Sequence, residues 1–347
     1  MAETSDGPLE NSWWPIRIVL KAGFLSFRLL DRAAPGLTNL LGVVIETAGR
    51  CQQKIRIARP DVVTMRVGET RFRLRLVGGH KQAHHIYLTI AAEGRVYEPV
   101  ATACLTRLLQ RLPEPAFMDI GAFVGYFTCY AAALLRDQQP VWAVESNPAF
   151  CGTIRKAVAL NGYTRVRVLE AALSDRPRTV TIQDTSVLPS AAERPGRRTV
   201  QAVTLDDLCA REAIAPRIVK IDVHGAEGRV LRGMSRLLRE SIQVILLEFH
   251  ALHEYQPHSP DITRLELLEY LEQSGFSVFH VAGHVSEHLS GMRVHLEQGR
   301  FAYVPVTAAT RQQLLYDRPV EILIVATKTP DLIEILGPPV ELAIAVG

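Results

Sequence analysis

The sequence predicts an α/β protein with a mostly parallel central sheet that is covered by helices on both faces. From Ala116 onward, short apolar segments alternate regularly with segments of helical periodicity, as expected for strands joined by crossover helices. The apolar segments are short and continuous, which is typical of strands buried on both faces. A glycine-rich turn follows the first of them, at the point where a strand would pass into a helix.

The chain before this region has a different pattern. Residues 13–32 and 36–58 are predicted to be helical. Residues 62–77 alternate between apolar and polar side chains, which predicts a β-hairpin with arginines at positions 71, 73 and 75 on its second face. Residues 86–90 could form another strand, and residues 97–112 are predicted to be a helix that leads into the sheet.

The elements expected after residue 115 follow at regular spacing. The expected strands are 116–119, 141–145, 165–172, 218–222, 244–249 and 276–281, and either 301–306 or 320–326 would be the seventh. The expected helices are 126–135, 147–160, 205–213, 225–240 and 261–274. Thr204 is expected to cap the third of these helices. Residues 180–182 and 199–202 look like extended arms around a polar loop, 184–198.

These elements divide the chain into four parts. They are an N-terminal helical extension (1–60), a β-hairpin lead-in (61–96), the main domain (97–306) and a C-terminal extension (307–347). The net charge of +3 gives no sign of a nucleic-acid partner. The apolar stretch 13–30 is interrupted by Arg17, Lys21 and Arg28, so we expect an amphipathic helix that packs on the body, with peripheral membrane contact less favoured.

The five cysteines are scattered and include no C-x-x-C pair. They are Cys51, Cys104, Cys129, Cys151 and Cys209. This pattern is typical of reduced thiols in a cytoplasmic protein and not of a disulfide framework or a zinc site.

A nucleotide-binding βαβ unit is predicted between residues 115 and 146. The first strand ends in Asp119, Gly121 and Gly125 follow, and the second strand ends in Glu145. The glycines would let the backbone approach a ligand, and the helix N-terminus would attract an anionic group. Glu145 could accept both hydroxyls of a ribose. The spacing Asp-x-Gly-x-x-x-Gly differs from Gly-x-Gly-x-x-Gly and favours S-adenosylmethionine (SAM) over a dinucleotide.

Acidic side chains lie at the ends of four predicted strands. They are Asp119, Glu145, Asp222 (followed by His224) and Glu248 (followed by His250). Ligands of open α/β sheets bind beyond the carboxyl ends of the strands, so these residues are expected to converge on one site.

Five blocks of the sequence together resemble the FkbM-type SAM-dependent methyltransferases. They read FMDIGAFVGYF, AVESNPAF, TLDDL, IVKIDVHGAEGRVLRGM and LLEFH, in order, and the resemblance covers residues 97–305. It implies a class I methyltransferase (Rossmann-like) fold with a seven-stranded sheet, SAM as cofactor, and O-methylation of a hydroxyl on a sugar, polyketide or other secondary metabolite. The family's motif after the fourth strand carries over to Lys220, Asp222, Gly225 and Glu227.

The expected cofactor contacts follow from these motifs. They are Asp119, Gly121, Ala122, Gly125, Glu145, Ser146, Asn147, Ala172, Leu173 and Asp222. Two positions depart from the family pattern, which usually has a small polar residue in place of Phe123 and Glu in place of His224. Phe123 could crowd the methionine end of SAM or pack against a helix. His224 could alter the base or the substrate, or end activity.

For catalysis, we expect His224 or Asp222 to take the proton of the acceptor hydroxyl, with Glu248 or His250 orienting the base. The acceptor would be a small molecule or a glycan, and the hairpin and the 184–198 loop are candidates for contacting it. Two other functions stay open. An NAD(P)-dependent oxidoreductase would share the βαβ unit but normally has Gly-x-Gly-x-x-Gly, and a non-catalytic methyltransferase-fold interaction module would explain Phe123 and His224.

No metal site is expected from the sequence. The histidines considered are His280, His284 and His288 at four-residue spacing, His253 and His258 nearby, and the group His80, His84 and His85. Gly283 and the strand-like run 276–281 argue against a single helix face, so these histidines are interpreted as surface residues.

Overall fold

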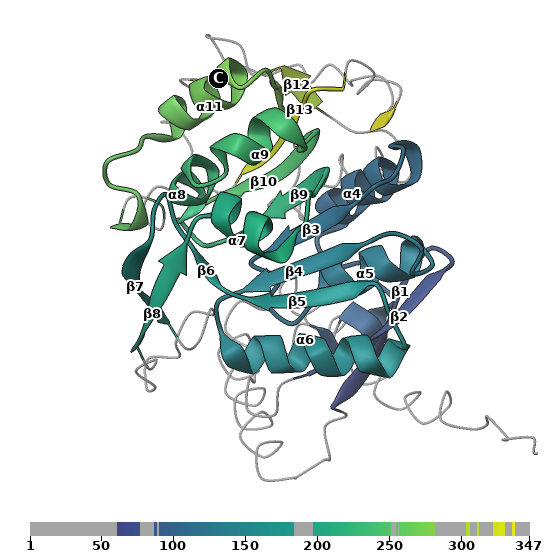
Figure 1. Ribbon diagram of the computed structural model, residues 1–347. Coiled ribbons are helices and arrows are strands. Elements are labelled where there is room, and N and C mark those ends of the chain that lie inside the picture. Colours follow the sequence, from purple (N-terminus) through teal and green to yellow (C-terminus); the bar gives the residue numbers. More distant parts are fainter. Residues whose placement is uncertain are drawn as a thin grey trace, which may run out of the picture.

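The computed structural model describes residues 61–76, 87–88, 90–183, 197–250, 255, 257–281, 303–305, 311, 322–329 and 335–336. The helices predicted for residues 13–32 and 36–58 and nearly all of the loop 184–198 lie outside these residues. Figure 1 shows a twisted central sheet with helices on both sides. Within the described residues, none of the helices combines the length and the apolar character needed to cross a membrane.

The central sheet has eight strands among the described residues, in the order β12-β11-β13-β10-β9-β3-β4-β5. Their bounds are β3 Phe117–Ile120, β4 Val141–Glu145, β5 Val166–Glu170, β9 Ile218–Ile221, β10 Val244–Phe249, β11 Ser277–Val281, β12 Tyr303–Pro305 and β13 Ile322–Thr327. The five strands from β10 to β5 are parallel, whereas β13 runs antiparallel between β10 and β11. The mostly parallel α/β sheet is therefore confirmed, and the short β12 adds an eighth strand to the seven predicted.

The strand order changes direction next to β3. From β3 the chain moves outward through β4 to β5, and it then returns to place β9 on the other side of β3. In open α/β sheets this switch point opens a crevice at the carboxyl ends of the two central strands. Because Gly121 follows β3 and Asp222 follows β9, the predicted glycine turn and one predicted acid meet at the switch point.

Helices cover both faces of the sheet because successive strand residues point to opposite sides (Figure 1). Phe117 packs in one core and its neighbour Met118 packs in the other; Leu246 and Leu247 of β10 divide in the same way. The first core is covered by α4 (Pro99–Arg111), α5 (Tyr126–Leu134) and α6 (Pro148–Asn161). The second is covered by α7 (Leu205–Glu212), α8 (Glu227–Arg232), α9 (Ser235–Glu240) and α11 (Arg264–Gln273).

The predicted hairpin is confirmed as β1 (Val62–Val67) and β2 (Thr70–Arg75). Its Phe72 ring lies against Tyr126 and Tyr130 of α5, with centroid distances of 5.4 and 5.8 Å. Of the three arginines predicted on its second face, two contact other parts of the protein: Arg73 donates to the carbonyl of Leu160, and Arg75 pairs with Asp61 at 2.9 Å. The hairpin is therefore docked against α5 and α6. Contact between the hairpin and a substrate stays a prediction.

The side-chain amide of Asn161 hydrogen-bonds the outer edge of β2, as the backbone of a neighbouring strand would. Its Oδ1 accepts a hydrogen bond from the Arg73 N–H at 2.8 Å, and its Nδ2 donates to the Arg73 carbonyl at 2.7 Å. Asn161→Ala should lower the free energy of unfolding by about 1–3 kcal/mol, because both backbone groups lose their partner. Urea denaturation measures this effect. Asn161→Asp, which keeps only the acceptor, should show an intermediate loss, and no change in either variant would contradict the docking role.

Two strand predictions need correction. Residues 87–88 and 90–93 are helical, not a strand, because buried Tyr87 packs among the tyrosines beside α5. The predicted strand 165–172 ends at Glu170, and β6 (Ala172–Leu173) joins a separate sheet with β8 (Arg197–Val203) and β7 (Arg178–Gln183). The prediction of two extended arms around the polar loop is confirmed, since they form the antiparallel pair β7 and β8.

The helix predicted for residues 225–240 is divided into α8 and α9. The Asp206 carboxylate accepts hydrogen bonds from the backbone N–H groups of Arg236 and Leu237 at 2.7 and 3.0 Å, which caps α9. This cap comes from α7, a distant part of the chain, so no local pattern predicts the break. The predicted cap of α7 is confirmed, since Thr204 Oγ1 accepts from the Asp207 N–H at 3.0 Å.

Candidate active site

The glycine turn after β3 is pressed against the end of β9. A Cβ added to Gly121 would lie 1.8 Å from the carbonyl oxygen of Asp222, and Gly121 has a φ of +80°. Gly125, with a φ of +85°, is the N-cap of α5. Only glycine fits the first of these positions, because any side chain would overlap the backbone of β9. The turn and Asp222 are therefore held together by direct backbone contact.

Glu145 points toward the glycine turn, as predicted. Its Oε2 accepts from the Phe123 N–H at 2.9 Å and its Oε1 accepts from the Asn147 N–H at 2.8 Å. Burial raises the pKa of Glu145, although these backbone donors act in the opposite direction. Oε1 also accepts from Ser146 Oγ at 3.4 Å. Each carboxylate oxygen has about two acceptor positions, so Oε2 retains capacity for a ligand hydroxyl.

Phe123 packs against α6. Its ring meets Phe150 edge to face with a centroid distance of 4.7 Å, and its backbone has a φ of +51°. Of the two readings of this position, packing against a helix is the one that the structure supports. The strained backbone directs the Phe123 N–H at Glu145 and so fixes the shape of the turn.

The remaining predicted cofactor residues lie around this turn. Asp119 is fully buried and accepts from Thr128 Oγ1 at 2.7 Å, and burial raises its pKa.

The residues after β4 and β5 lie beside Glu145. Asn147 caps α6 by accepting from the Ala149 N–H at 2.9 Å, and Ser146 lies beside Glu145. Ala122 packs under the turn. Ala172 and Leu173 follow Ala171, whose N–H donates to the Glu145 carbonyl at 3.0 Å. Their contact with a cofactor stays a prediction.

A charged cluster lies at the ends of β9 and β10. Lys220 is buried, and its Nζ lies 2.8 Å from Asp222 Oδ2 and 3.8 Å from Glu248 Oε2, above the Phe127 ring at 4.5 Å. Burial alone would lower the pKa of Lys220, but Asp222, Glu98 and Glu248 raise it above its usual range. Burial would raise the pKa of Asp222, yet Lys220 and the neighbouring histidines hold it well below its usual range. Lys220 and Asp222 therefore form an ion pair in which the ammonium group is buried and the carboxylate is partly exposed.

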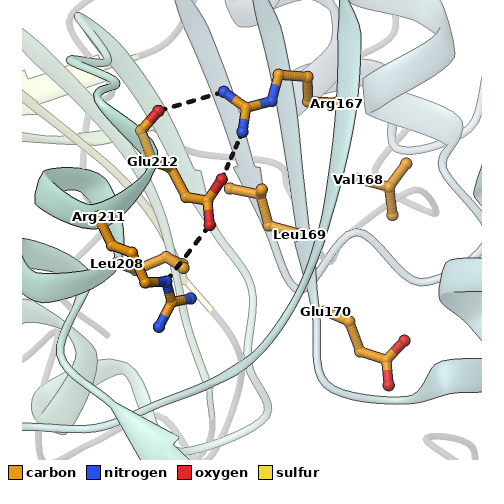
Figure 2. A pocket seen from close by; sticks show the side chains of 7 residues that line it. All are labelled: Arg167, Val168, Leu169, Glu170, Leu208, Arg211 and Glu212. Atoms are coloured by element: carbon orange, nitrogen blue, oxygen red, sulfur yellow. Dashed lines mark hydrogen bonds and ion pairs between the residues drawn. The ribbon is translucent and has the colours of Figure 1, made fainter.

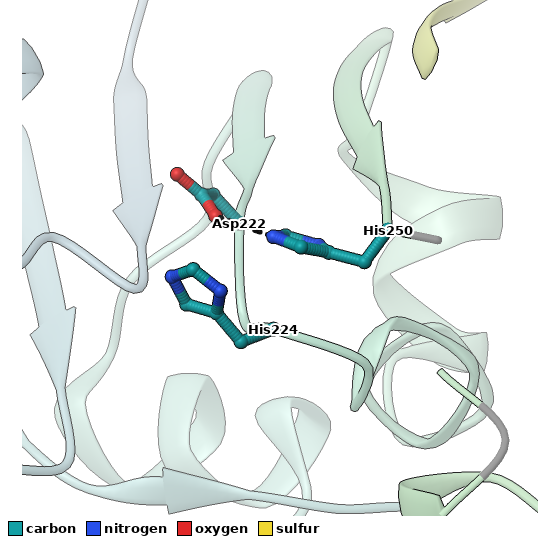
Figure 3. A group of neighbouring side chains, drawn as sticks. All are labelled: Asp222, His224 and His250. Carbon is teal, nitrogen blue, oxygen red and sulfur yellow. Dashed lines mark ion pairs between the residues drawn. The ribbon is translucent and has the colours of Figure 1, made fainter. Parts of the chain in front are cut away.

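Figure 3 shows Asp222, His224 and His250 converging from the ends of these two strands. His250 is buried and His224 is exposed, and their ring centroids are 4.5 Å apart. His250 Nδ1 lies 2.6 Å from Glu227 Oε1, and His250 Nε2 lies 3.7 Å from Asp222 Oδ1. Burial disfavours the charged ring, but Glu227 raises the pKa of His250 to about 10. The four predicted catalytic residues, Asp222, His224, Glu248 and His250, are thus brought together.

Glu98 is a further site residue that the strand-end pattern does not predict. Its carboxylate joins those of Asp222 and Glu248 in a group whose ligand atoms lie within 4.8 Å of one another. Glu98 is the N-cap of α4 and has a φ of +41°. The preceding region shows no strand-and-acid pattern, so only the dipeptide Glu98-Pro99 at a helix start marked this position.

A surface pocket of about 400 Å³ lies elsewhere, between β5 and α7 (Figure 2). Its lining residues are Arg167, Val168, Leu169, Glu170, Leu208, Arg211 and Glu212. Arg167 and Arg211 both pair with Glu212, so the charges in the pocket largely satisfy one another. It contains none of the predicted site residues. Of the histidines considered for a metal, only His258 and His280 are among the described residues, and His280 is buried on β11.

The sheet order, the switch point and the glycine turn define an α/β nucleotide-binding fold of the class I methyltransferase type. Residues 119–278 match the family model of the methyltransferase FkbM domain, which confirms the resemblance over this segment. No curated protein matches the chain.

Several solved structures are distantly similar. The methyltransferase FkbM from Methylobacillus flagellatus KT has 14% identity and a TM-score of 0.40, covering 72% of this chain and 55% of its own. A SAM-dependent methyltransferase from Agrobacterium tumefaciens has 12% identity and a TM-score of 0.41, covering 79% and 72%. Precorrin-6y C5,15-methyltransferase from Geobacter metallireducens GS-15 has 19% identity and a TM-score of 0.34, covering 66% and 87%. These likenesses are too distant to transfer a ligand or an activity.

Proposed function

We propose that this chain is a SAM-dependent methyltransferase that methylates a hydroxyl oxygen of a sugar, polyketide or other secondary metabolite. The observation that carries the proposal is the contact between Gly121 and Asp222, which places the Glu145-bound turn and the charged cluster on the two sides of one switch point. One side suits an adenosyl group and the other suits an acceptor.

The residues of the turn fit SAM. The backbone at Gly121 leaves no Cβ in the way, and Glu145 Oε2 retains an acceptor position for a ribose hydroxyl. The carboxylates beside Lys220 outnumber it, so the cluster favours a cationic ligand such as a sulfonium. When bound, SAM supplies an electrophilic methyl group and leaves as a neutral thioether.

The chain's own residues would position the acceptor and remove its proton. The acceptor oxygen must lie in line with the methyl, and positioning supplies most of the rate enhancement for such a transfer. Asp222 and His224 would face the hydroxyl, and Glu227 and Glu248 would hold the cluster from behind, as the contacts of His250 and Lys220 suggest. The proton passes from the acceptor to the imidazole of His224 or to the Asp222 carboxylate as the new oxygen–carbon bond forms.

The experiment is a calorimetric titration of the full chain with SAM and, separately, with NADPH. The wild-type protein should bind SAM and not NADPH. Glu145→Gln should weaken SAM binding about 10- to 100-fold, because a charge-assisted hydrogen bond is worth about 1.5–3 kcal/mol. The matched control is Glu170→Gln, at the end of the neighbouring strand and exposed, which should leave SAM affinity unchanged.

Other outcomes assign the chain differently. Binding of NADPH in place of SAM would indicate an oxidoreductase, and binding of neither would indicate a non-catalytic module. Oxygen as the acceptor atom is tested by incubating the protein with methyl-labelled SAM and cell metabolites. A labelled product whose methyl is on nitrogen or carbon would contradict O-methylation.

A further inference from the structure

We propose that Asp222, His224 and His250 bind a divalent first-row transition-metal ion, such as Zn²⁺. Each of the three side chains offers one ligand atom, and these atoms lie within 4.8 Å of one another. Two ligands of one tetrahedral Zn²⁺ are separated by about 3.4 Å, given ligand distances of about 2.0–2.2 Å. The Asp222 Oδ1 to His250 Nε2 distance of 3.7 Å is close to this value, so little movement is needed (Figure 3).

His250 is oriented as metal-bound histidines are. Its Nδ1 lies 2.6 Å from Glu227 Oε1, which directs Nε2 toward Asp222. Glu227 is fully buried, and the same oxygen accepts from the Gly225 N–H at 2.9 Å, so the carboxylate is fixed. A carboxylate behind a histidine is the usual second layer of a metal site, because it sets the ring orientation and makes the ligand nitrogen more basic.

Asp222 divides its two oxygens between different partners. Oδ2 pairs with Lys220 Nζ at 2.8 Å, while Oδ1 faces His250. Lys220 therefore holds Asp222 in place and leaves one carboxylate oxygen for a ligand bond. Glu227 and Glu248 add two more buried acids around the histidines. An ion bound at His250 Nε2 would replace the proton there, which leaves to solvent, so the three acids Asp222, Glu227 and Glu248 would then face the single positive charge of Lys220. A divalent cation would balance this excess.

The donor atoms select the class of metal. Two imidazole nitrogens and one carboxylate oxygen suit Zn²⁺, Co²⁺ and similar ions, whereas Mg²⁺ and Ca²⁺ prefer sites built entirely from oxygen. Three protein ligands also leave a coordination position open. The exposed position of His224 puts the open side of the cluster toward solvent, where an acceptor hydroxyl could bind and lose its proton more easily. His224 would then act on the acceptor through the ion.

The inference goes beyond the proposed function and is tested without activity. Untagged full-length protein, freed of metal with EDTA and dialysed, is titrated with CoCl₂ while the visible absorption of bound Co²⁺ is recorded, and with ZnCl₂ by calorimetry. One equivalent should bind. His224→Ala should weaken binding at least about 10-fold, and Glu227→Gln about 10- to 100-fold. The control His258→Ala removes an exposed histidine outside the cluster and should change nothing.

Circular dichroism and urea denaturation check that each variant is folded. The inference is overturned if wild-type protein binds no Co²⁺ at millimolar concentration, if His224→Ala binds Co²⁺ as tightly as wild type does, or if excess MgCl₂ displaces the bound Co²⁺. A SAM titration on the same preparations separates the two proposals: protein that binds SAM and no Co²⁺ contradicts only the metal site, and protein that binds Co²⁺ and no SAM contradicts only the proposed function.

Discussion

Gly121→Ala is expected to lower the free energy of unfolding by about 3 kcal/mol or more and to abolish SAM binding. The new Cβ would lie 1.8 Å from the Asp222 carbonyl oxygen. The oxygen is part of the backbone and the Cβ is bonded directly to it, so neither atom can turn away as the end of a flexible side chain could. Neither strand can move away, because β3 and β9 are neighbours in the middle of the sheet. Overlap of this kind is among the few mechanisms that produce large effects from one methyl group.

The matched control is Gly68→Ala in the hairpin turn. Gly68 also has a positive φ, +56°, but no atom lies within 4 Å of the added Cβ. Only the cost of an L-residue at positive φ, about 1–2 kcal/mol, applies there. Urea denaturation measures both variants, and calorimetry measures SAM affinity. Equal losses of stability at the two positions would show that backbone conformation, and not the contact with β9, explains the glycine.

Lys220→Met is expected to lower the free energy of unfolding by about 3–5 kcal/mol. Methionine keeps the packing over Phe127 but leaves Asp222 and Glu248 without the buried ammonium group that neutralises them. Removing one partner of a buried ion pair is costly because the other charge stays buried and uncompensated.

Two further variants test this explanation by urea denaturation. Lys156→Met on α6 removes an exposed ammonium group and should change stability by no more than about 0.5 kcal/mol. The double variant Lys220→Met/Asp222→Asn should lose at least about 1 kcal/mol less than the sum of the two single variants, since the charge that was left unpaired is removed. Strict additivity would mean that the two side chains act independently.

Much of the fold could be predicted because its strands are short, apolar and buried on both faces. The strand 244–249 was predicted with the same bounds as β10, and Thr204 was recognised as the cap of α7. What local pattern could not supply came from contacts between distant segments. Asp206 divides the predicted helix 225–240, and the pairing of 322–327 with both β10 and β11 decides which late segment enters the sheet.

The site could be predicted as a set of strand ends but not as a set of contacts. Position in the sequence placed Asp222 and Glu248 on neighbouring strands, which β9 and β10 confirm. It did not reveal that Glu227 holds His250 or that Lys220 lies between the two acids, because both are buried contacts across elements. The expected convergence of His224 and His250 is confirmed by their ring distance of 4.5 Å, but sequence spacing points to metal binding only at histidines that are close together in the chain.

The position of β13 in the sheet has a consequence for folding during translation. Residues 322–327 insert between β10 and β11, although both of those strands are synthesised earlier. At about 5–20 residues per second, the 78 residues between Phe249 and Thr327 take roughly 4–15 s to emerge. During that interval the hydrogen-bonding edge of β10 has no native partner. A nascent chain of this protein is therefore most in need of chaperone protection late in translation, after most of its core already exists.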